Sequence, residues 1–92
     1  MAYKIHFEKH VVEEDLDELN NDVRQRILTA IGSRLTISPE QYGVPLRKTL
    51  KQYWKLRVGD YRVVFKLVKS EVHIIAIVHR KKVYLIALNR IN

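Results

Sequence analysis

The sequence of 92 residues contains no cysteine, three glycines and two prolines. A chain without cysteine forms no disulfide, offers no thiolate nucleophile and builds no zinc site of the usual cysteine type. Long apolar runs are also missing, because the longest clean one covers residues 74–78 and is far too short to span a membrane. Residues 1–8 lack the apolar run of a signal peptide. We therefore expect a cytoplasmic protein without a membrane partner.

Acidic residues are scarce in the second half of the chain. Residues 43–92 hold twelve lysines and arginines against two acids, a balance of +10. Residues 1–22 hold seven acids and two lysines (−5), and residues 23–42 hold three arginines and one glutamate (+2), which together give the net charge of +7. A basic half beside an acidic one is typical of nucleic-acid binding. The alternative interpretation is solvated charge without a partner.

Side-chain periodicity predicts one strand and two helices in the first half. Residues 2–7 alternate weakly and contain β-prone side chains, which favours a strand. Apolar residues at i, i+4 and i+7 predict a helix over residues 9–19. A second apolar stripe predicts a helix that ends at about Leu35 and is capped by Asn21 or Asp22.

The second half of the chain is predicted to be a loop followed by strands. Two prolines and a glycine indicate a loop over residues 39–45. Alternating apolar side chains then predict strands over residues 53–58, 61–68 and 72–78, and residues 83–91 form a short amphipathic helix. The order β-α-α-β-β-β indicates an α+β fold in one domain, residues 1–92. In this fold an antiparallel sheet packs one apolar face on two N-terminal helices, and a short C-terminal helix or tail follows.

The hairpin over residues 51–62, Lys-Gln-Tyr-Trp-Lys-Leu-Arg-Val-Gly-Asp-Tyr-Arg, is the most informative segment. Gly59-Asp60 is a preferred pair for a turn that needs positive φ. Strand side chains alternate between faces, so one face carries four cations and a tyrosine: Tyr53, Lys55, Arg57, Arg62 and Lys66. The other face is apolar and packs on the helices. The basic face is expected to stay open, and it is suited to a polyanion.

The element order, this hairpin and a last strand that runs into His79-Arg80-Lys81-Lys82-Val83-Tyr84 together resemble the RelE/ParE toxin superfamily, on its RelE side. The resemblance covers essentially the whole chain. RelE-like toxins of type II toxin–antitoxin systems enter the ribosomal A site and cut mRNA there, because the 2′-hydroxyl of the message attacks the adjacent phosphate. The resemblance therefore implies a metal-independent endoribonuclease without a cofactor. Its implied partners are the ribosome, mRNA and a cognate RelB-like antitoxin, a small acidic protein.

The resemblance also implies a set of catalytic residues. By position, the family's lysine in the hairpin falls on Lys55, its two arginines on Arg62 and Arg80, and its C-terminal tyrosine on Tyr84. His79 resembles a histidine that many relatives carry nearby. Two features depart from the RelE prototype: its second lysine is Tyr53 here, and the spacing from Arg80 to Tyr84 is shorter.

Transesterification at phosphate needs a base, donors that stabilise the phosphorane and an acid for the leaving oxygen. Arg62 and Arg80 suit the phosphorane, since a guanidinium binds phosphate through two donors. The base is Lys55, if neighbouring cations favour its neutral amine, or His79, because histidine is the side-chain type most often used as a general base. The remaining residues expected to bind RNA, by charge or by stacking on bases, are Lys51, Tyr53, Arg57, Lys66, Lys81 and Lys82.

Each assignment has a structural alternative. Arg62 can pair with an acid such as Asp60 or Glu18, His79 can simply end a strand, and Tyr84 can belong to the core. For the whole protein, the alternatives are a ParE-like gyrase inhibitor and an inactive relative that only binds RNA or the ribosome. The remaining histidines are scattered and show no ligand spacing, so no metal site is expected at His6, His10 or His73.

Overall fold

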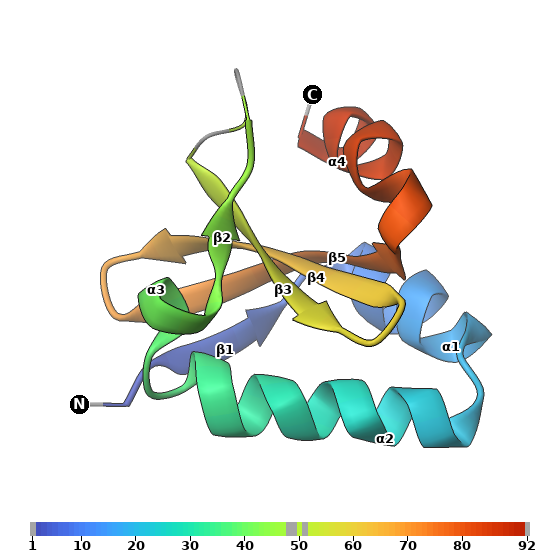
Figure 1. Cartoon of the computed structure of the whole chain (residues 1–92), viewed down its shortest axis with the longest axis horizontal. Coiled ribbons are helices and arrows are strands. Elements are labelled where there is room, and N and C mark those ends of the chain that lie inside the picture. Colours follow the sequence, from blue (N-terminus) through green and yellow to red (C-terminus); the bar gives the residue numbers. More distant parts are fainter. Residues whose placement is uncertain (1, 48–49, 51, 92) are drawn as a thin grey trace.

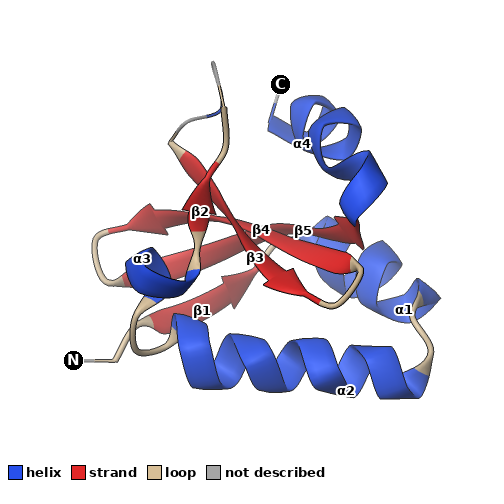
Figure 2. Ribbon diagram, in the orientation of Figure 1, coloured by secondary structure: helices blue, strands red, loops and turns tan. Residues whose placement is uncertain are grey.

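The computed structural model describes residues 2–47, 50 and 52–91 (Figure 1). Five strands form one sheet in the order β1-β5-β4-β3-β2. The strands are β1 (Lys4–Phe7), β2 (Val44–Pro45), β3 (Tyr53–Val58), β4 (Tyr61–Val68) and β5 (Glu71–His79). The helical segments are η1 (Val11–Asp15), α1 (Leu16–Glu18), α2 (Asn21–Ala30), η2 (Ile31–Leu35), α3 (Pro39–Tyr42), η4 (Arg80–Lys82) and α4 (Val83–Ile91). The predicted α+β class is confirmed, and Figure 2 shows α2 and α4 on opposite sides of the sheet.

The three predicted helical segments are all present. The first consists of the π-helical η1 followed by α1, the second runs through α2 into the π-helical η2, and the third is α4. The cap of the second is Asn20, one residue before the predicted position, because its side chain accepts the backbone N–H of Val23 at 2.9 Å. None of the described helices is both long and apolar enough to cross a membrane.

The segment predicted as a loop contains two short elements. Pro39 begins α3, a position where proline's missing N–H costs no hydrogen bond. The next element, β2, pairs with the start of β3. Gly43 joins the two, and a Cβ atom there would lie 2.7 Å from Cζ of Phe65. The close approach of Phe65 to the backbone is the physical reason for glycine at this position.

The strands β3, β4 and β5 form the predicted antiparallel meander. The β3–β4 turn is at Gly59-Asp60, and Gly59 has the expected positive φ of 60°. The first strand pairs with β5 in parallel, so the complete sheet is mixed. This pairing aligns His6 with His73 across the sheet.

The main core lies between one face of the sheet and the N-terminal helical segments. Its buried side chains are Val11, Leu19, Ile27, Ala30, Ile31, Leu35, Leu56, Val58, Val63, Phe65, Val72, Ile74 and Ile77. Trp54 and Tyr61 are half-buried against it. The face predicted to be apolar is therefore the face that the N-terminal helices cover.

The opposite face is not open along its whole length, which corrects the sequence-based expectation. A second buried cluster lies between this face and α4, with Leu46, Leu50, Tyr53, Val64, Ile75, Ala76, Val83 and Ala87. The sequence signal for a basic face came from β3 and β4 alone, whereas α4 packs over β5 and β4. The cations are thus confined to the part of the face that α4 leaves free.

An ion pair between Asp15 and Arg90 joins the N-terminal helical segment to α4. Arg90 donates from Nη1 and Nη2 to the two carboxylate oxygens at 2.7 and 2.8 Å. The hydrogen bonds to Asp15 raise the pKa of Arg90, and its burial acts in the opposite direction. Asp15 is only 7% exposed. Its charge is therefore stabilised by the two hydrogen bonds from Arg90 and not by water.

The same pair binds the backbone of β5 where β1 has ended. The β1 ladder stops at Ile74, and the register of β5 against β4 shifts at a bulge beside Ile75. The carboxylate of Asp15 accepts the N–H of Ile77 at 2.8 Å, and Arg90 donates to the carbonyl of Ile75 at 3.0 Å. The pair therefore satisfies strand-edge groups that would otherwise be buried without a partner.

We expect the substitution Asp15→Ala to destabilise the protein by about 3–5 kcal/mol, because it leaves the partly buried guanidinium of Arg90 and the backbone N–H of Ile77 without their partner. Denaturant unfolding followed by far-UV circular dichroism measures the change. Asp17→Ala is the control, since Asp17 is an exposed residue of α1 and should change stability by less than about 0.5 kcal/mol. Equal stabilities of the two variants would show that the ion pair does not hold α4.

Candidate nucleic-acid interface

Two arginines face each other at the end of the hairpin. Arg57 and Arg62 are direct cross-strand partners of β3 and β4. Like charges in this arrangement repel one another. In the described residues no carboxylate lies within 4.0 Å of either guanidinium, so the pairing of Arg62 with Asp60 or Glu18 is not found. Two opposed cations without a counter-charge favour a bound anion.

Arg62 is held by the hairpin turn. Its Nη1 donates to the carbonyl oxygens of Gly59 at 3.0 Å and Tyr61 at 2.9 Å. These two bonds orient one edge of the guanidinium and leave its remaining donors available. An arginine fixed in this way is suited to a phosphate, since it loses little side-chain freedom when the anion binds.

The aromatic ring of Tyr84 joins a second group of cations to this face. The Lys55 amine lies 5.9 Å from the ring centre, and the Arg47 guanidinium lies 6.0 Å from it. The Tyr84 hydroxyl accepts the backbone N–H of Arg47 at 3.3 Å. Tyr84 is half-buried against the second cluster, so it contributes both to packing and to the basic surface.

Arg47 is a residue that the sequence analysis missed. It belongs to the segment between β2 and β3, where no strand pattern assigns a side chain to a face. The only sequence signal is its charge, which is shared with many other residues. The packing of α4 on the sheet places Tyr84 beside it, and no local pattern predicts that packing.

The end of β5 lies next to the hairpin turn. The backbone N–H of Arg80 donates to the carbonyl of Asp60 at 2.8 Å. This bond brings the start of η4 beside the turn that carries Arg62. Arg80, Lys81 and Lys82 are all exposed, so three consecutive cations flank the opposed pair of arginines.

His79 lies on the other face of the sheet. Its ring meets Tyr61 edge-on, with centroids 5.8 Å apart, and Tyr61 packs against the main core. The imidazole Nδ1 accepts the backbone N–H of Lys81 at 3.2 Å and caps η4. The structure therefore does not bring His79 together with Lys55 and Arg62. The bulge in β5 changes which residues face each side, and simple alternation does not reveal it.

Two of the residues expected to bind RNA lie elsewhere. Tyr53 is 7% exposed and belongs to the cluster under α4, so it cannot stack on a base as predicted. Lys66 lines a hollow together with Glu8 and His10, at the end of the sheet remote from the hairpin turn. Lys51 lies outside the described residues. The prediction that Tyr53 is exposed was wrong. Strand alternation indicates which face of the sheet its ring lies on, but it does not reveal that α4 covers that part of the face.

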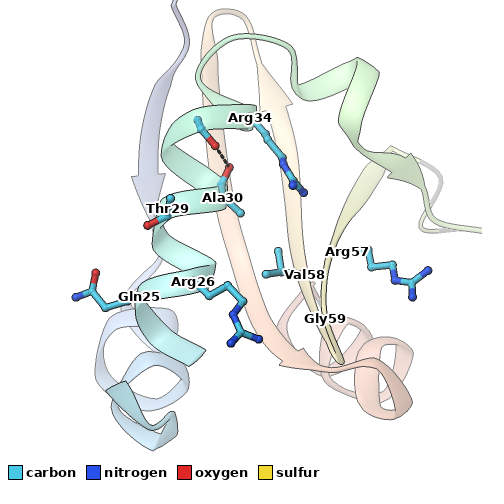
Figure 3. Close-up of a pocket in the computed structure, with 9 residues that line it drawn as sticks. Gln25, Arg26, Thr29, Ala30, Arg34, Arg57, Val58 and Gly59 are labelled. Carbon is cyan, nitrogen blue, oxygen red and sulfur yellow. Dashed lines mark hydrogen bonds between the residues drawn. The ribbon is translucent and has the colours of Figure 1, made fainter. Parts of the chain in front are cut away.

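A groove between α2 and β3 extends the basic surface around the edge of the sheet. It has a volume of about 570 Å³ and is lined by Arg26, Arg34 and Arg57. Figure 3 shows Arg26 and Arg34 reaching from the helix toward the space beside β3, whereas Arg57 points away from the helix. The strand β2 covers β3 only at Trp54 and Lys55. We refer to this feature as the α2–β3 groove.

Comparison with protein families identifies the chain. Residues 3–84 match a family model described as the ParE toxin of type II toxin–antitoxin systems. The chain belongs to this family, and it is a type II toxin of the RelE/ParE superfamily. No curated protein matches it.

Solved structures confirm the fold of these toxins. The RelBE2 toxin–antitoxin complex of Mycobacterium tuberculosis matches with a TM-score of 0.81 and 24% identity, over 87% of this chain and 100% of that one. A mutant of the Escherichia coli toxin RelE in the free state matches with a TM-score of 0.77 and 23% identity, and each chain is covered completely. A RelB–RelE complex of Methanococcus jannaschii matches with a TM-score of 0.66 and 25% identity, over 86% of this chain and 94% of that one.

We expect binding to a short single-stranded RNA to weaken steeply as salt is raised, because neutralised phosphates release counterions. Arg57→Ala and Arg62→Ala should each flatten the dependence of log K on log salt by roughly 0.7, the value for one phosphate contact on a single strand. Fluorescence anisotropy between low and physiological ionic strength measures the slope. Lys9→Ala, an exposed cation of the acidic first part of the chain, should leave it unchanged. A flat dependence for the wild type would contradict a phosphate-binding surface.

Proposed function

We propose that this toxin is a metal-independent endoribonuclease that acts in the cytoplasm and cleaves mRNA in the ribosomal A site. The observation that carries the proposal is one surface that combines opposed arginines with a lysine over a tyrosine ring: Arg57, Arg62, Lys55 and Tyr84. Arg80 flanks the surface through its backbone bond to the turn. These residue types can bind phosphate, stabilise the charge of the phosphorane and stack on a base during RNA cleavage.

In this proposal the 2′-hydroxyl of the message attacks the adjacent phosphorus to give a 2′,3′-cyclic phosphate. The bond to the 5′-oxygen breaks, and this oxygen leaves as a hydroxyl group after it takes a proton from water. Arg62 and Arg80 stabilise the added negative charge of the phosphorane. Lys55 takes the proton of the 2′-hydroxyl. Lys55 is favoured as the base over His79 because the histidine lies on the opposite face of the sheet, beside Tyr61. Tyr84 offers a ring on which a base can stack, and Arg47 adds a further cation beside that ring.

We expect Arg80→Ala to lower single-turnover cleavage of ribosome-bound message by about 10²–10³-fold, because a fixed donor acts mainly on the transition state. Arg80→Lys should rescue little, since an ammonium lacks the planar fork of two donors. Lys81→Ala is the matched control: the neighbouring exposed cation should lower ribosome affinity and leave the rate of the bound complex unchanged. Wild-type cleavage by bound Arg80→Ala would refute the assignment.

The two candidate bases are separated by their substitutions. Lys55→Ala should reduce the single-turnover rate by about 10²–10⁴-fold, the usual contribution of a general base. His79→Ala should keep the rate and the pH profile of the wild type, because its ring faces away from the site. The rate is measured across pH 5–9 with saturating toxin. Loss of a pH limb in His79→Ala alone would transfer the role to the histidine.

The family model names ParE, and this observation keeps a gyrase inhibitor as the second candidate. Expression of the toxin, followed by primer extension on a translated message and by an assay of DNA integrity, separates the functions. Codon-phased breaks in the message support the ribonuclease. DNA damage with intact message supports the gyrase inhibitor, and normal growth supports an inactive RNA-binding or ribosome-binding relative.

We also propose that a small acidic, RelB-like antitoxin binds this chain and covers the outer face of α4. The solved relatives from Mycobacterium tuberculosis and Methanococcus jannaschii are toxin–antitoxin complexes. On α4 of this chain, Leu85 and Leu88 are 64% and 43% exposed. They are three positions apart and share a helix face. An amphipathic antitoxin helix can bury both side chains, and its acids can meet the basic residues nearby.

We expect the toxin to melt at a higher temperature with the antitoxin encoded by the adjacent gene, because a partner that binds only the folded state stabilises it. Leu85→Ser should reduce that rise without lowering the melting temperature of the free toxin. Ile37→Ser is the matched control, since Ile37 is 66% exposed and lies outside α4. Equal melting temperatures with and without the antitoxin would contradict this partner.

A further inference from the structure

Two histidines that are 67 positions apart in sequence lie side by side in the sheet. His6 of β1 and His73 of β5 are direct partners in the parallel ladder, and their ring centroids are 4.9 Å apart. Glu8 follows at the end of β1, and its Oε1 lies 3.8 Å from Nδ1 of His73. One ligand atom from each of these three residues lies within 4.8 Å of the other two. The sequence showed no ligand spacing because the parallel pairing of β1 creates the cluster.

Glu71 fixes the orientation of His73. The Nε2 of His73 lies 2.9 Å from Oε1 of Glu71, a distance at which the ring N–H donates to the carboxylate. A neutral ring that donates from Nε2 carries its lone pair on Nδ1, the atom that faces Glu8. Two lone-pair carriers then face each other at 3.8 Å, which is too long for a hydrogen bond. A carboxylate behind a histidine whose other nitrogen is free is the arrangement that orients histidine ligands of metal ions.

We propose that His6, His73 and Glu8 bind one divalent transition-metal ion of the zinc class, and that Glu71 positions His73. Two imidazoles and a carboxylate form the donor set of many three-ligand zinc sites, which keep a fourth position for water. Tetrahedral ligands around zinc are roughly 3.3 Å apart, from metal–ligand distances of about 2.0–2.1 Å. The three ligand atoms must therefore approach by roughly 1.5 Å at most, and the exposed His6 ring is free to turn inward.

The bound ion would join the first strand to the last. The β1–β5 ladder has only four residue pairs, and the metal would cross-link it at its third pair. The site lies near the start of β5, whereas Arg80 follows the end of this strand, so the site is separate from the proposed catalytic surface. Lys4 and Lys66 are the cross-strand neighbours of Glu71 and His73. Both are long flexible cations that can turn away from an ion. The backbones of His6, Glu71 and His73 are held by the ladder, and that of Glu8 is held by its N–H, which donates to the carbonyl of Ile74 at 3.0 Å.

Zinc binding to the purified full chain at pH 7.5 tests the proposal. Isothermal titration should show one site, and thermal unfolding should shift upward with Zn²⁺ and return when a chelator is added, because an ion that binds the folded state stabilises it. Cobalt gives a second readout, the visible absorption of a four-coordinate Co²⁺ centre. Neither readout depends on toxin activity.

Variants assign the ligands. His6→Ala and His73→Ala should each abolish the one-site binding, the thermal shift and the cobalt absorption. Glu71→Gln should weaken binding by about 10–100-fold, the usual effect of a group that orients a ligand. His10→Ala is the matched control: His10 lies 2.8 Å from Glu14 and forms an exposed histidine–glutamate pair, but it is not part of the cluster.

The proposal stands if His10→Ala binds zinc like the wild type while His6→Ala and His73→Ala do not. It is overturned if zinc produces neither heat nor a thermal shift. It is also overturned if all three histidine variants lose the same fraction of binding, since that result indicates adventitious surface binding. A thermal stability that rises as pH falls and ignores zinc would overturn it too, because it would identify an imidazolium held between Glu8 and Glu71.

Discussion

The ion pair between Asp15 and Arg90 is the interaction on which the arrangement of this toxin depends. The first strand covers only the beginning of β5, and the bulge beside Ile75 shifts the rest of that strand against β4. At this uncovered edge Asp15 accepts a hydrogen bond from the backbone of β5, Arg90 donates one to it, and the two side chains also bond to each other. The pair thereby fixes η1 at one edge of the sheet and α4 over the adjoining face. A chain of 92 residues has few other side chains that could bond to the backbone at that edge.

The position of α4 in turn determines which cations can work together. Its first turn places Tyr84 near both Lys55 and Arg47, and its buried side chains remove Tyr53 from the surface. The basic residues left exposed lie around the hairpin turn and the end of β5. Crowding Arg57 against Arg62 opposes folding, since like charges across a ladder repel. That arrangement is reasonable where a polyanion supplies the missing negative charge.

The sheet also shows how one strand can change the chemistry of a surface. A meander of β3, β4 and β5 is predictable from alternation and from the Gly59-Asp60 turn, because both signals are local. The parallel addition of β1 has no local signal, since its partner lies more than sixty positions away. Only that pairing brings His6 beside His73 and creates a group of side chains whose ligand atoms lie within 4.8 Å of one another.

The sequence alone determined the α+β class, the longer helical and strand segments and the basic hairpin, because periodicity, capping and turn residues act within a few positions. It also carried the resemblance to the RelE/ParE toxin superfamily, which the family match confirms. Tertiary structure decided the rest. The bulge in β5 turned His79 to the face that the N-terminal helices cover. The packing of α4 buried Tyr53 and placed Tyr84 beside Arg47, and the edge pairing of β1 assembled the histidine cluster. Each of these outcomes depends on contacts between segments far apart in the chain, where no local pattern of residues distinguishes one face or one neighbour from another.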